Sequence, residues 1–211
     1  MKKRLLASVF LVWAMSSATA GAAPLLVNTT HPLQPQNYEP PRLVEPIVPT
    51  YAAFIGKLES ELTPETSAQL ENLFAAASHQ GIKLMLTSGY RPYDEQRQLF
   101  GRAMSNDQHQ ETVAPPGFSE HQTGLAADIA TTDQFCAGQG CFMLTKAATW
   151  LTDHAHEYGF ITRYPRDKTA ITGYEYEPWH LRYVGKETAT TMSSSGATLE
   201  EYLAPSCSSR V

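Results

Sequence analysis

The sequence predicts a single α+β domain, with a mainly antiparallel central sheet flanked by helices. Helical and strand patterns intermix along the chain, with no long linker after residue 50. The 211 residues suffice for one full-sized core. A hydrophobic content of 42% and the lack of a short repeat exclude a disordered chain, collagen and a coiled coil.

The first strong helical pattern begins at Thr63, where a capping residue is followed by proline and then by an acidic residue. Gly81 is expected to end this helix. Between them the apolar residues recur at helical spacing: Leu70, Leu73, Phe74 and Ala77.

The remaining elements follow from shorter patterns. Strands are expected at residues 82–87, 125–130, 160–163 and 179–184. Helices are expected at about 94–104, 145–158, 187–192 and 198–203.

The first 20 residues have the pattern of a secretory signal peptide. A basic start precedes an apolar run at 5–15, and Ala18-Thr19-Ala20 fits the small-residue cleavage rule. No stretch approaches the roughly 20 apolar residues that span a bilayer, so we expect no stable membrane insertion. We therefore expect an exported protein, located in the periplasm or outside the cell.

Seven prolines mark residues 21–50 as an extended strap over the surface, and residues 51–211 are expected to form the folded domain. Sixteen basic and 21 acidic residues give a net charge of -5, which excludes an electrostatic nucleic-acid binder.

The cysteines are interpreted in the light of export, because exported proteins permit disulfides. Cys136 and Cys141 flank a flexible four-residue turn, and we predict a disulfide between them. Two reduced thiols, or half of a metal site, are the alternatives. Cys207 is then left over near the C-terminus.

Two segments carry residues suited to metal chemistry: S-E-H-Q-T-G-L-A-A-D at 119–128 and E-P-W-H at 177–180. Together they offer His121, Asp128 and His180, and two histidines with one carboxylate form a recurring catalytic zinc set. Glu177 is a spare carboxylate three residues before the second histidine.

Strand alternation supports this assignment. Asp128 would share its face with two alanines, which leaves room for a metal ion. In the strand from Trp179, we expect His180 and Arg182 to face the site while Trp179 is buried on the other face. Pro178 is expected to break the strand ladder and let Glu177 turn toward the metal.

A third segment, S-G-Y-R-P-Y-D-E-Q at 88–96, lies at a strand-to-helix junction. Its Arg91 is a planar, permanently charged donor that suits a carboxylate or a developing oxyanion. The alternative is a surface salt bridge with Asp94 or Glu95.

The three segments, with Y-E-P-W-H-L-R-Y-V-G continuing the second, resemble the signatures of VanY-type zinc D-alanyl-D-alanine carboxypeptidases, in the lysostaphin / D-Ala-D-Ala metallopeptidase / hedgehog fold group. The resemblance covers about residues 26–203 and makes 51–211 a metallopeptidase domain. It implies one zinc ion per chain on His121, Asp128 and His180.

The same resemblance implies that Glu177 is the general base and that Arg91 stabilises the oxyanion or binds substrate. It implies that Gln96 and Ser119 also touch substrate. The substrate would be a peptidoglycan stem peptide that loses its terminal D-alanine, and we expect a monomeric enzyme.

Several alternatives share some of these features. A serine D,D-peptidase needs S-x-x-K and K-T-G, and both are absent. An L,D-carboxypeptidase or a D,D-dipeptidase would use the same machinery, and the choice among the three stays open. A zinc-stabilised cell-wall binding module is the non-enzyme alternative, but a structural zinc needs neither Glu177 nor Arg91.

Overall fold

The computed structural model describes residues 24–51, 57–106, 113–132 and 139–204. Their central feature is a four-stranded sheet in the order β1-β2-β4-β3, in which every pair of neighbours is antiparallel. The strands are β1 (Leu84–Ser88), β2 (Ala126–Thr131), β3 (Phe160–Tyr164) and β4 (Glu177–Tyr183). The predicted α+β class with an antiparallel sheet is confirmed.

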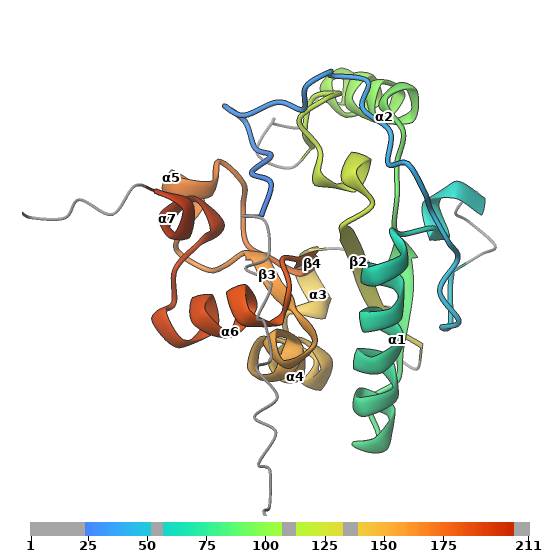
Figure 1. The fold of residues 1–211 in the computed structure, drawn as a ribbon, viewed down its shortest axis with the longest axis vertical. Coiled ribbons are helices and arrows are strands. Elements are labelled where there is room, and N and C mark those ends of the chain that lie inside the picture. Colours follow the sequence, from blue (N-terminus) through green and yellow to red (C-terminus); the bar gives the residue numbers. More distant parts are fainter. Residues whose placement is uncertain (1–23, 52–56, 107–112, 133–138, 205–211) are drawn as a thin grey trace, which may run out of the picture.

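The helices surround this sheet (Figure 1). The α-helices are α1 (Pro64–His79), α2 (Tyr93–Ser105), α3 (Gln139–Phe142), α4 (Lys146–His154), α5 (Thr169–Thr172), α6 (Lys186–Ser195) and α7 (Leu199–Leu203). The 3-10 helices are η1 (Lys57–Ser60), η2 (Glu120–Thr123) and η3 (Ala155–Tyr158). The helix expected at 145–158 is thus divided into α4 and η3, while α3, α5, η1 and η2 were not predicted.

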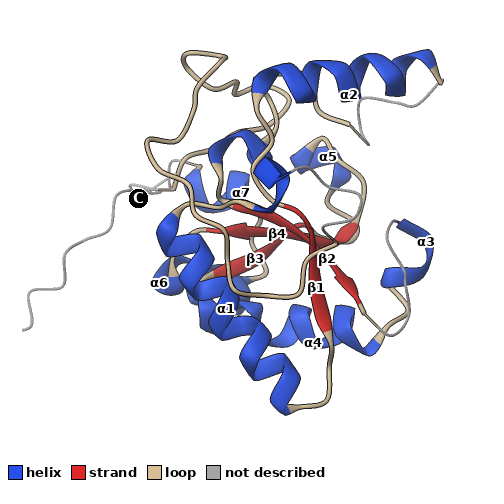
Figure 2. Ribbon diagram, turned by 90° about the vertical axis from the view of Figure 1, so that its right-hand side faces the viewer, coloured by secondary structure: helices blue, strands red, loops and turns tan. Residues whose placement is uncertain are grey.

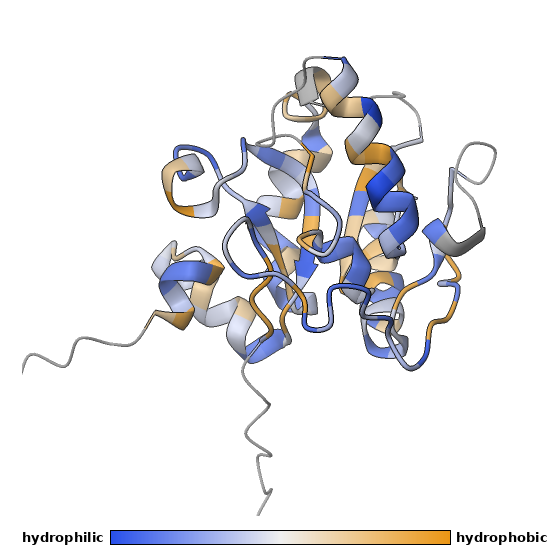
Figure 3. Cartoon of the chain, turned by 90° about the horizontal axis from the view of Figure 1, so that it is seen from above, coloured by the Kyte–Doolittle hydropathy of each residue, from blue (hydrophilic) through white to orange (hydrophobic). Residues whose placement is uncertain are grey.

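Helices lie on both sides of the strands, and α1, α4 and α6 share one side (Figure 2). Individual helices carry both apolar and polar residues, as helices that cover a core do (Figure 3). The main core contains residues from α1, the sheet and α4, among them Leu73, Ile129, Leu151 and Leu181. These side chains are almost fully buried and pack the sheet against α1 and α4.

A smaller core attaches the C-terminal helices to the edge of the sheet. Ile161 of β3 packs with Ala189 and Met192 of α6 and with Leu199 of α7. Helix α7 begins with a capping box, in which the hydroxyl of Thr198 accepts a hydrogen bond from the backbone of residue 201. This cap holds the first turn of α7 close to β3.

The proline-rich segment from residue 24 to 50 forms no helix or regular strand. It contacts the domain through isolated pairs, Val44 with Leu62 and Thr50 with Leu86. The proposed division of the chain at residues 20 and 50 stays a prediction, because residues 1–20 lie outside the described part. Among the described helices, none is long and apolar enough to cross a membrane.

The cysteine prediction falls partly on residues that the structure does not describe. Cys141 is disulfide-bonded. Cys136 and Cys207 lie outside the described residues, so the pairing of Cys136 with Cys141 stays a prediction.

The last strand corrects one expectation. β4 begins at Glu177 rather than Trp179, and Pro178 lies inside it. Tyr164 pairs with Glu177 and Thr162 with Leu181, so residues 178–180 bulge opposite a single residue of β3. A bulge leaves residues unpaired, so proline is tolerated there without ending the strand.

Candidate metal centre

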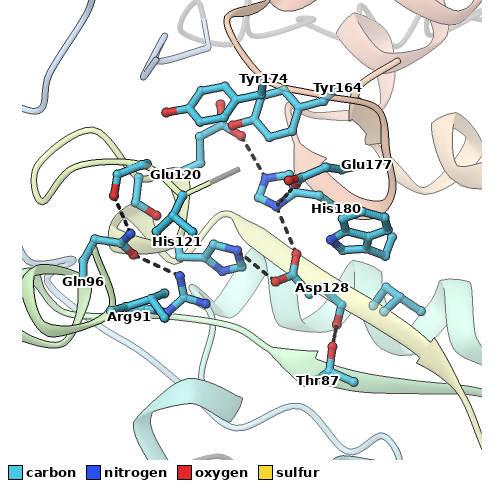
Figure 4. A pocket seen from close by; sticks show the side chains of 16 residues that line it. Thr87, Arg91, Gln96, Glu120, His121, Asp128, Tyr164, Tyr174, Glu177 and His180 are labelled. Atoms are coloured by element: carbon cyan, nitrogen blue, oxygen red, sulfur yellow. Dashed lines mark hydrogen bonds and ion pairs between the residues drawn. The ribbon is translucent and has the colours of Figure 1, made fainter. Parts of the chain in front are cut away.

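The strand register brings two of the predicted ligands together. Asp128 of β2 lies directly opposite His180 of β4. Directly opposed residues project to the same face of a sheet. The Oδ1 atom of Asp128 is therefore only 3.0 Å from Nδ1 of His180 (Figure 4).

The third predicted ligand, His121, comes from the 3-10 turn η2, which ends at Gly124 in the left-handed conformation (φ 67°). Its Nδ1 lies 2.7 Å from the carbonyl oxygen of Gly89. A carbonyl only accepts hydrogen bonds, so Nδ1 carries the proton and Nε2 presents a lone pair. That Nε2 atom is 3.3 Å from Oδ2 of Asp128.

Gly89 permits this contact because its backbone runs against another segment. A Cβ atom at position 89 would lie 2.6 Å from the carbonyl oxygen of Glu61, which is closer than real side chains come. Only glycine therefore allows this backbone to carry its carbonyl group to His121.

The donor set fits zinc. One ligand atom from each of His121, Asp128 and His180 lies within 4.8 Å of the others. Two imidazole nitrogens and a carboxylate oxygen fill three positions of a tetrahedral zinc site and leave the fourth open, as in catalytic sites. The three residues would hold one zinc ion, as the sequence predicted.

The ligands shift one another's pKa values. Burial acts to raise the pKa of Asp128, but the charge and hydrogen bond of His121 outweigh burial, so the pKa is lowered and this carboxyl group stays ionised. Burial lowers the pKa of His121. Burial also acts against the charged form of His180, but hydrogen bonds to Asp128 and Glu120 raise its pKa to about 9.

Glu177 lies beside the ligands, with Oε2 4.0 Å from Nδ1 of His180. Only 8% of the residue is exposed. Burial raises the pKa of Glu177 to about 8, and the negative charge of Asp128 adds to the shift. A carboxyl group whose pKa lies near neutrality can both accept and release a proton, as a general base must.

Arg91 is held by its neighbours at the other side of the site. Its guanidinium donates to Oε1 of Gln96 at 2.9 Å and to Oγ of Ser88 at 2.7 Å. Gln96 is itself fixed, because Nε2 donates to the carbonyl oxygen of Ala114 at 2.7 Å. No ion pair of Arg91 with Asp94 or Glu95 is found among the described residues, and Asp94 pairs with Arg97 instead.

These side chains line one cavity of about 300 Å³. Its lining includes Glu177, the three ligands, Arg91, Gln96 and Ser119. The cavity therefore collects every site residue that the sequence predicted. The roles of Gln96 and Ser119 in binding substrate stay predictions.

One expectation about β4 is wrong. Trp179, expected on the buried face away from the site, lines the cavity while packing partly on the main core. The bulge at residues 178–180 disturbs the strict alternation on which this expectation rested. Arg182 shares the sheet face of His180, as expected, but it is fully buried and donates to Oε1 of Glu120 at 2.7 Å rather than bordering the cavity itself.

Sequence reasoning also missed several residues that surround the ligands. Tyr164 stacks on the ring of His180, with ring centroids 4.9 Å apart. Tyr174 lies against Tyr164 and borders the cavity. Glu120 accepts from Nε2 of His180 at 3.4 Å. The position of Glu120 beside His121 was the only available signal.

Comparison with known proteins gives a consistent result. The sequence profile of the family VanY, described as D-alanyl-D-alanine carboxypeptidase, matches residues 59–186. VanXYC of Enterococcus gallinarum, a bifunctional D-Ala-D-Ala dipeptidase and D-Ala-D-Ala carboxypeptidase, is 38% identical over 182 residues, which are 84% of this chain and 91% of that protein. A D-alanyl-D-alanine carboxypeptidase of Enterococcus faecalis is 39% identical over 65% of this chain.

This chain spans 53% of the length of that Enterococcus faecalis protein and 65% of YodJ of Bacillus subtilis, to which it is 44% identical. Several of the relatives therefore contain further sequence that has no counterpart in the matched region.

Solved structures share the fold. The LD-carboxypeptidase LdcB superimposes with a TM-score of 0.77 at 44% identity, covering 84% of this chain and 83% of LdcB. The D,D-pentapeptidase VanY of a VanB-type cassette, solved with Zn(II), gives a TM-score of 0.68 at 34% identity, covering 85% of this chain and 97% of that one. A related structure contains VanYB with D-alanine-D-alanine.

Proposed function

We propose that this chain, which belongs to the VanY family of D-alanyl-D-alanine carboxypeptidases, removes the terminal D-alanine from peptidoglycan stem peptides in a zinc-dependent reaction. One observation carries the proposal. A zinc-type ligand trio, a buried carboxyl group with a raised pKa and a fixed guanidinium all border the same cavity. A merely structural zinc site would need neither of the last two groups.

Zinc, when bound by His121, Asp128 and His180, would supply a Lewis acid that activates water and polarises a carbonyl oxygen. Glu177 takes a proton from the attacking water and passes it to the amine nitrogen of the departing D-alanine. Its burial and its distance of 4.0 Å from a ligand atom of His180 support this role.

Arg91 stabilises negative charge, either on the carbonyl oxygen of the cleaved bond or on the substrate carboxylate. Its two contacts, to Gln96 and Ser88, hold the guanidinium at the cavity wall before substrate arrives. A donor that is already oriented loses little entropy when the charge develops. Gln96 contributes at least by fixing Arg91, and Ser119 borders the same space.

An L,D-carboxypeptidase is the second candidate, because the structure of LdcB, an LD-carboxypeptidase, is 44% identical to this chain. The two activities differ in the configuration of the residue before the cleaved bond. The same ligands and the same base serve both reactions.

Mass spectrometry of stem peptides incubated with zinc-loaded protein tests the proposal. Release of one D-alanine from a pentapeptide ending in D-Ala-D-Ala supports the D,D-activity, whereas cleavage of the tetrapeptide alone supports the L,D-activity. Cleavage of free D-Ala-D-Ala would identify a dipeptidase. No cleavage of any of the three, by protein whose zinc content is verified, would contradict the enzyme assignment and favour a binding module.

We also propose that the chain is exported through the signal sequence at residues 1–20 and acts as a monomer outside the cytoplasm. The substrate is located there, which supports export. N-terminal sequencing of the exported protein and its mass in solution test these two points. A mature chain that begins at Met1 would contradict the signal peptide.

A further inference from the structure

Beneath the metal ligands lies a group of four charged residues that the proposed reaction does not use. We call Glu120, Arg163, Arg182 and Glu200 the closed cluster. Both arginine side chains and that of Glu120 have no exposed surface, and 14% of the Glu200 side chain is exposed. Two positive and two negative charges balance one another.

The carboxylate of Glu120 divides its two oxygens between two tasks. Oε1 accepts from Nε of Arg163 at 2.8 Å and from Nη1 of Arg182 at 2.7 Å. Oε2 faces Nε2 of His180 at 3.4 Å. The arginines therefore hold one oxygen in place while the other contacts a metal ligand.

This contact determines which nitrogen of His180 is available to a metal. Both carboxylates only accept hydrogen bonds, so without a metal each ring nitrogen can donate, Nε2 to Glu120 and Nδ1 to Asp128. When zinc binds, Glu120 keeps the proton on Nε2, and Nδ1, which lies beside the ligand Asp128, is the nitrogen that would bind the metal. Tyr164 packs against the same ring from its face. Together the two contacts set both the tautomer and the orientation of the ring.

The closed cluster also extends to both ends of the described chain. Glu200 of α7 accepts from Arg163 at 2.6 and 3.0 Å, and one of its oxygens also accepts from Asn28 at 3.0 Å. Arg182 donates to the carbonyl oxygen of Leu25 at 2.7 Å. Segments more than 150 residues apart are thus connected, through the two arginines, to the carboxylate that contacts His180.

We propose that Glu120 is a positioning residue for the zinc ion, and that Arg163, Arg182 and Glu200 serve to hold it in place. Stability alone explains the closed cluster poorly, since well-packed apolar residues are often as stabilising as buried ion pairs. The contact of Glu120 with the metal ligand His180 provides a functional reason for burying these charges. The inference rests on the zinc site and not on the choice of substrate.

The test is the zinc affinity of Glu120→Gln, measured by competition with a chelator under conditions where the zinc-free protein is fully folded. Glutamine keeps the size but turns an amide donor toward either His180 or the arginines. Loss of such an outer contact to a metal ligand typically costs about 10–100-fold in affinity, and we expect this range. The absorption spectrum of bound Co²⁺ should change as well, because the ligand geometry changes.

Two further variants protect the test against a folding defect. Glu200→Gln acts at a distance from the metal and should weaken zinc binding in the same direction, by less. Lys168→Gln is the matched control. It removes a surface ion pair of 3.0 Å between Lys168 and Glu201 of α7, and this pair does not contact the closed cluster. It should leave zinc affinity unchanged.

Unchanged zinc affinity and an unchanged Co²⁺ spectrum in folded Glu120→Gln would overturn the proposal, even if the melting temperature fell. If that variant does not fold, Glu200→Gln decides, and an affinity equal to that of Lys168→Gln would overturn the proposal. Both results can be obtained without any peptide substrate, so they are independent of the proposed activity.

Discussion

His180 lies between two charged regions that differ in their surroundings. On the cavity side, Glu177 and Arg91 face a space large enough for a peptide end. On the other side, the side chains of Glu120, Arg163 and Arg182 in the closed cluster have no exposed surface, and two arginines bind the carboxylate of Glu120. Both regions contact the same imidazole ring, at Nδ1 and Nε2 respectively.

The pKa values of the two glutamates shift in opposite directions. Burial raises the pKa of Glu177 to about 8, because the charge of His180 at 4.0 Å offsets burial only in part and the negative charge of Asp128 adds to the rise. Burial also acts to raise the pKa of Glu120, but Arg182 and Arg163 outweigh it and hold the pKa far below its usual range. A fully paired carboxylate fixes geometry, whereas an incompletely paired one remains able to exchange a proton.

The largest effect is expected at Glu177, the proton-exchanging carboxyl group on the cavity side. Replacing it by glutamine keeps the shape but removes the proton acceptor, so kcat should fall by about 10²–10⁴-fold. KM should change little, and zinc should remain bound. Peptide hydrolysis and metal analysis on the same sample check both points.

The control for this variant is Glu157→Gln, at an exposed ion pair with His154, which should keep normal activity. A zinc-replete Glu177→Gln protein with near-normal kcat would contradict the assignment of the base. A zinc-poor one would instead move Glu177 into the group of residues that orient the ligands.

Arg91→Lys should have the next largest effect. Lysine keeps the charge but cannot make the two simultaneous contacts to Gln96 and Ser88 that orient the guanidinium. Loss of an oriented donor of this kind costs about 10²–10³-fold in kcat. Arg97→Lys, at an exposed ion pair on helix α2, which begins just after Arg91, is the control. Turnover of Arg91→Lys equal to that of the control would reject a catalytic role for Arg91.

Lowering the pH should destabilise the folded protein through the closed cluster. Burial acts to raise the pKa of Glu200, but the hydrogen bond and charge of Arg163 outweigh it, and the pKa is lowered. A lowered pKa means that stability is present above the unfolded value of about 4.3 and is lost as pH falls through the folded value.

We therefore expect the melting temperature of the wild type to fall as pH falls below about 4, and the curve of Glu200→Gln to be flatter over that range. Both proteins are measured with a chelator present, so that release of zinc does not contribute. Parallel curves for the two proteins would show that Glu200 does not stabilise the folded state through its charge.

The smallest effect is expected at the cap of α7. Thr198→Ala removes the side-chain oxygen that accepts from the backbone of residue 201 and should lower the free energy of unfolding by about 1 kcal/mol. Denaturant unfolding measures this loss. Because the cap lies on the closed side and away from the cavity, kcat should not change, and a large fall in kcat would show that the two regions are not separable.

The sequence by itself determined the elements and the chemistry of the cavity. The helical spacing from Leu70 to Ala77 predicted α1, because periodicity is a local property of the chain. The motifs around His121, Asp128 and His180 predicted the zinc ligands, because two histidines with one carboxylate form a recurring zinc-binding set. The α+β class followed from the order of the patterns.

The contacts between the site residues depend on the tertiary structure and could not be predicted from local patterns. The register that sets Asp128 opposite His180 depends on pairing between residues 52 positions apart in the chain, which no local pattern encodes. The bulge at residues 178–180 also depends on pairing with β3, and it lets Trp179 border the cavity against the expectation from alternation. The contact of Glu120 with His180 could be identified only from the tertiary structure, in which Arg163 and Arg182 bind the same carboxylate. Burial and long-range contacts, not sequence spacing, determine the role of a buried charge.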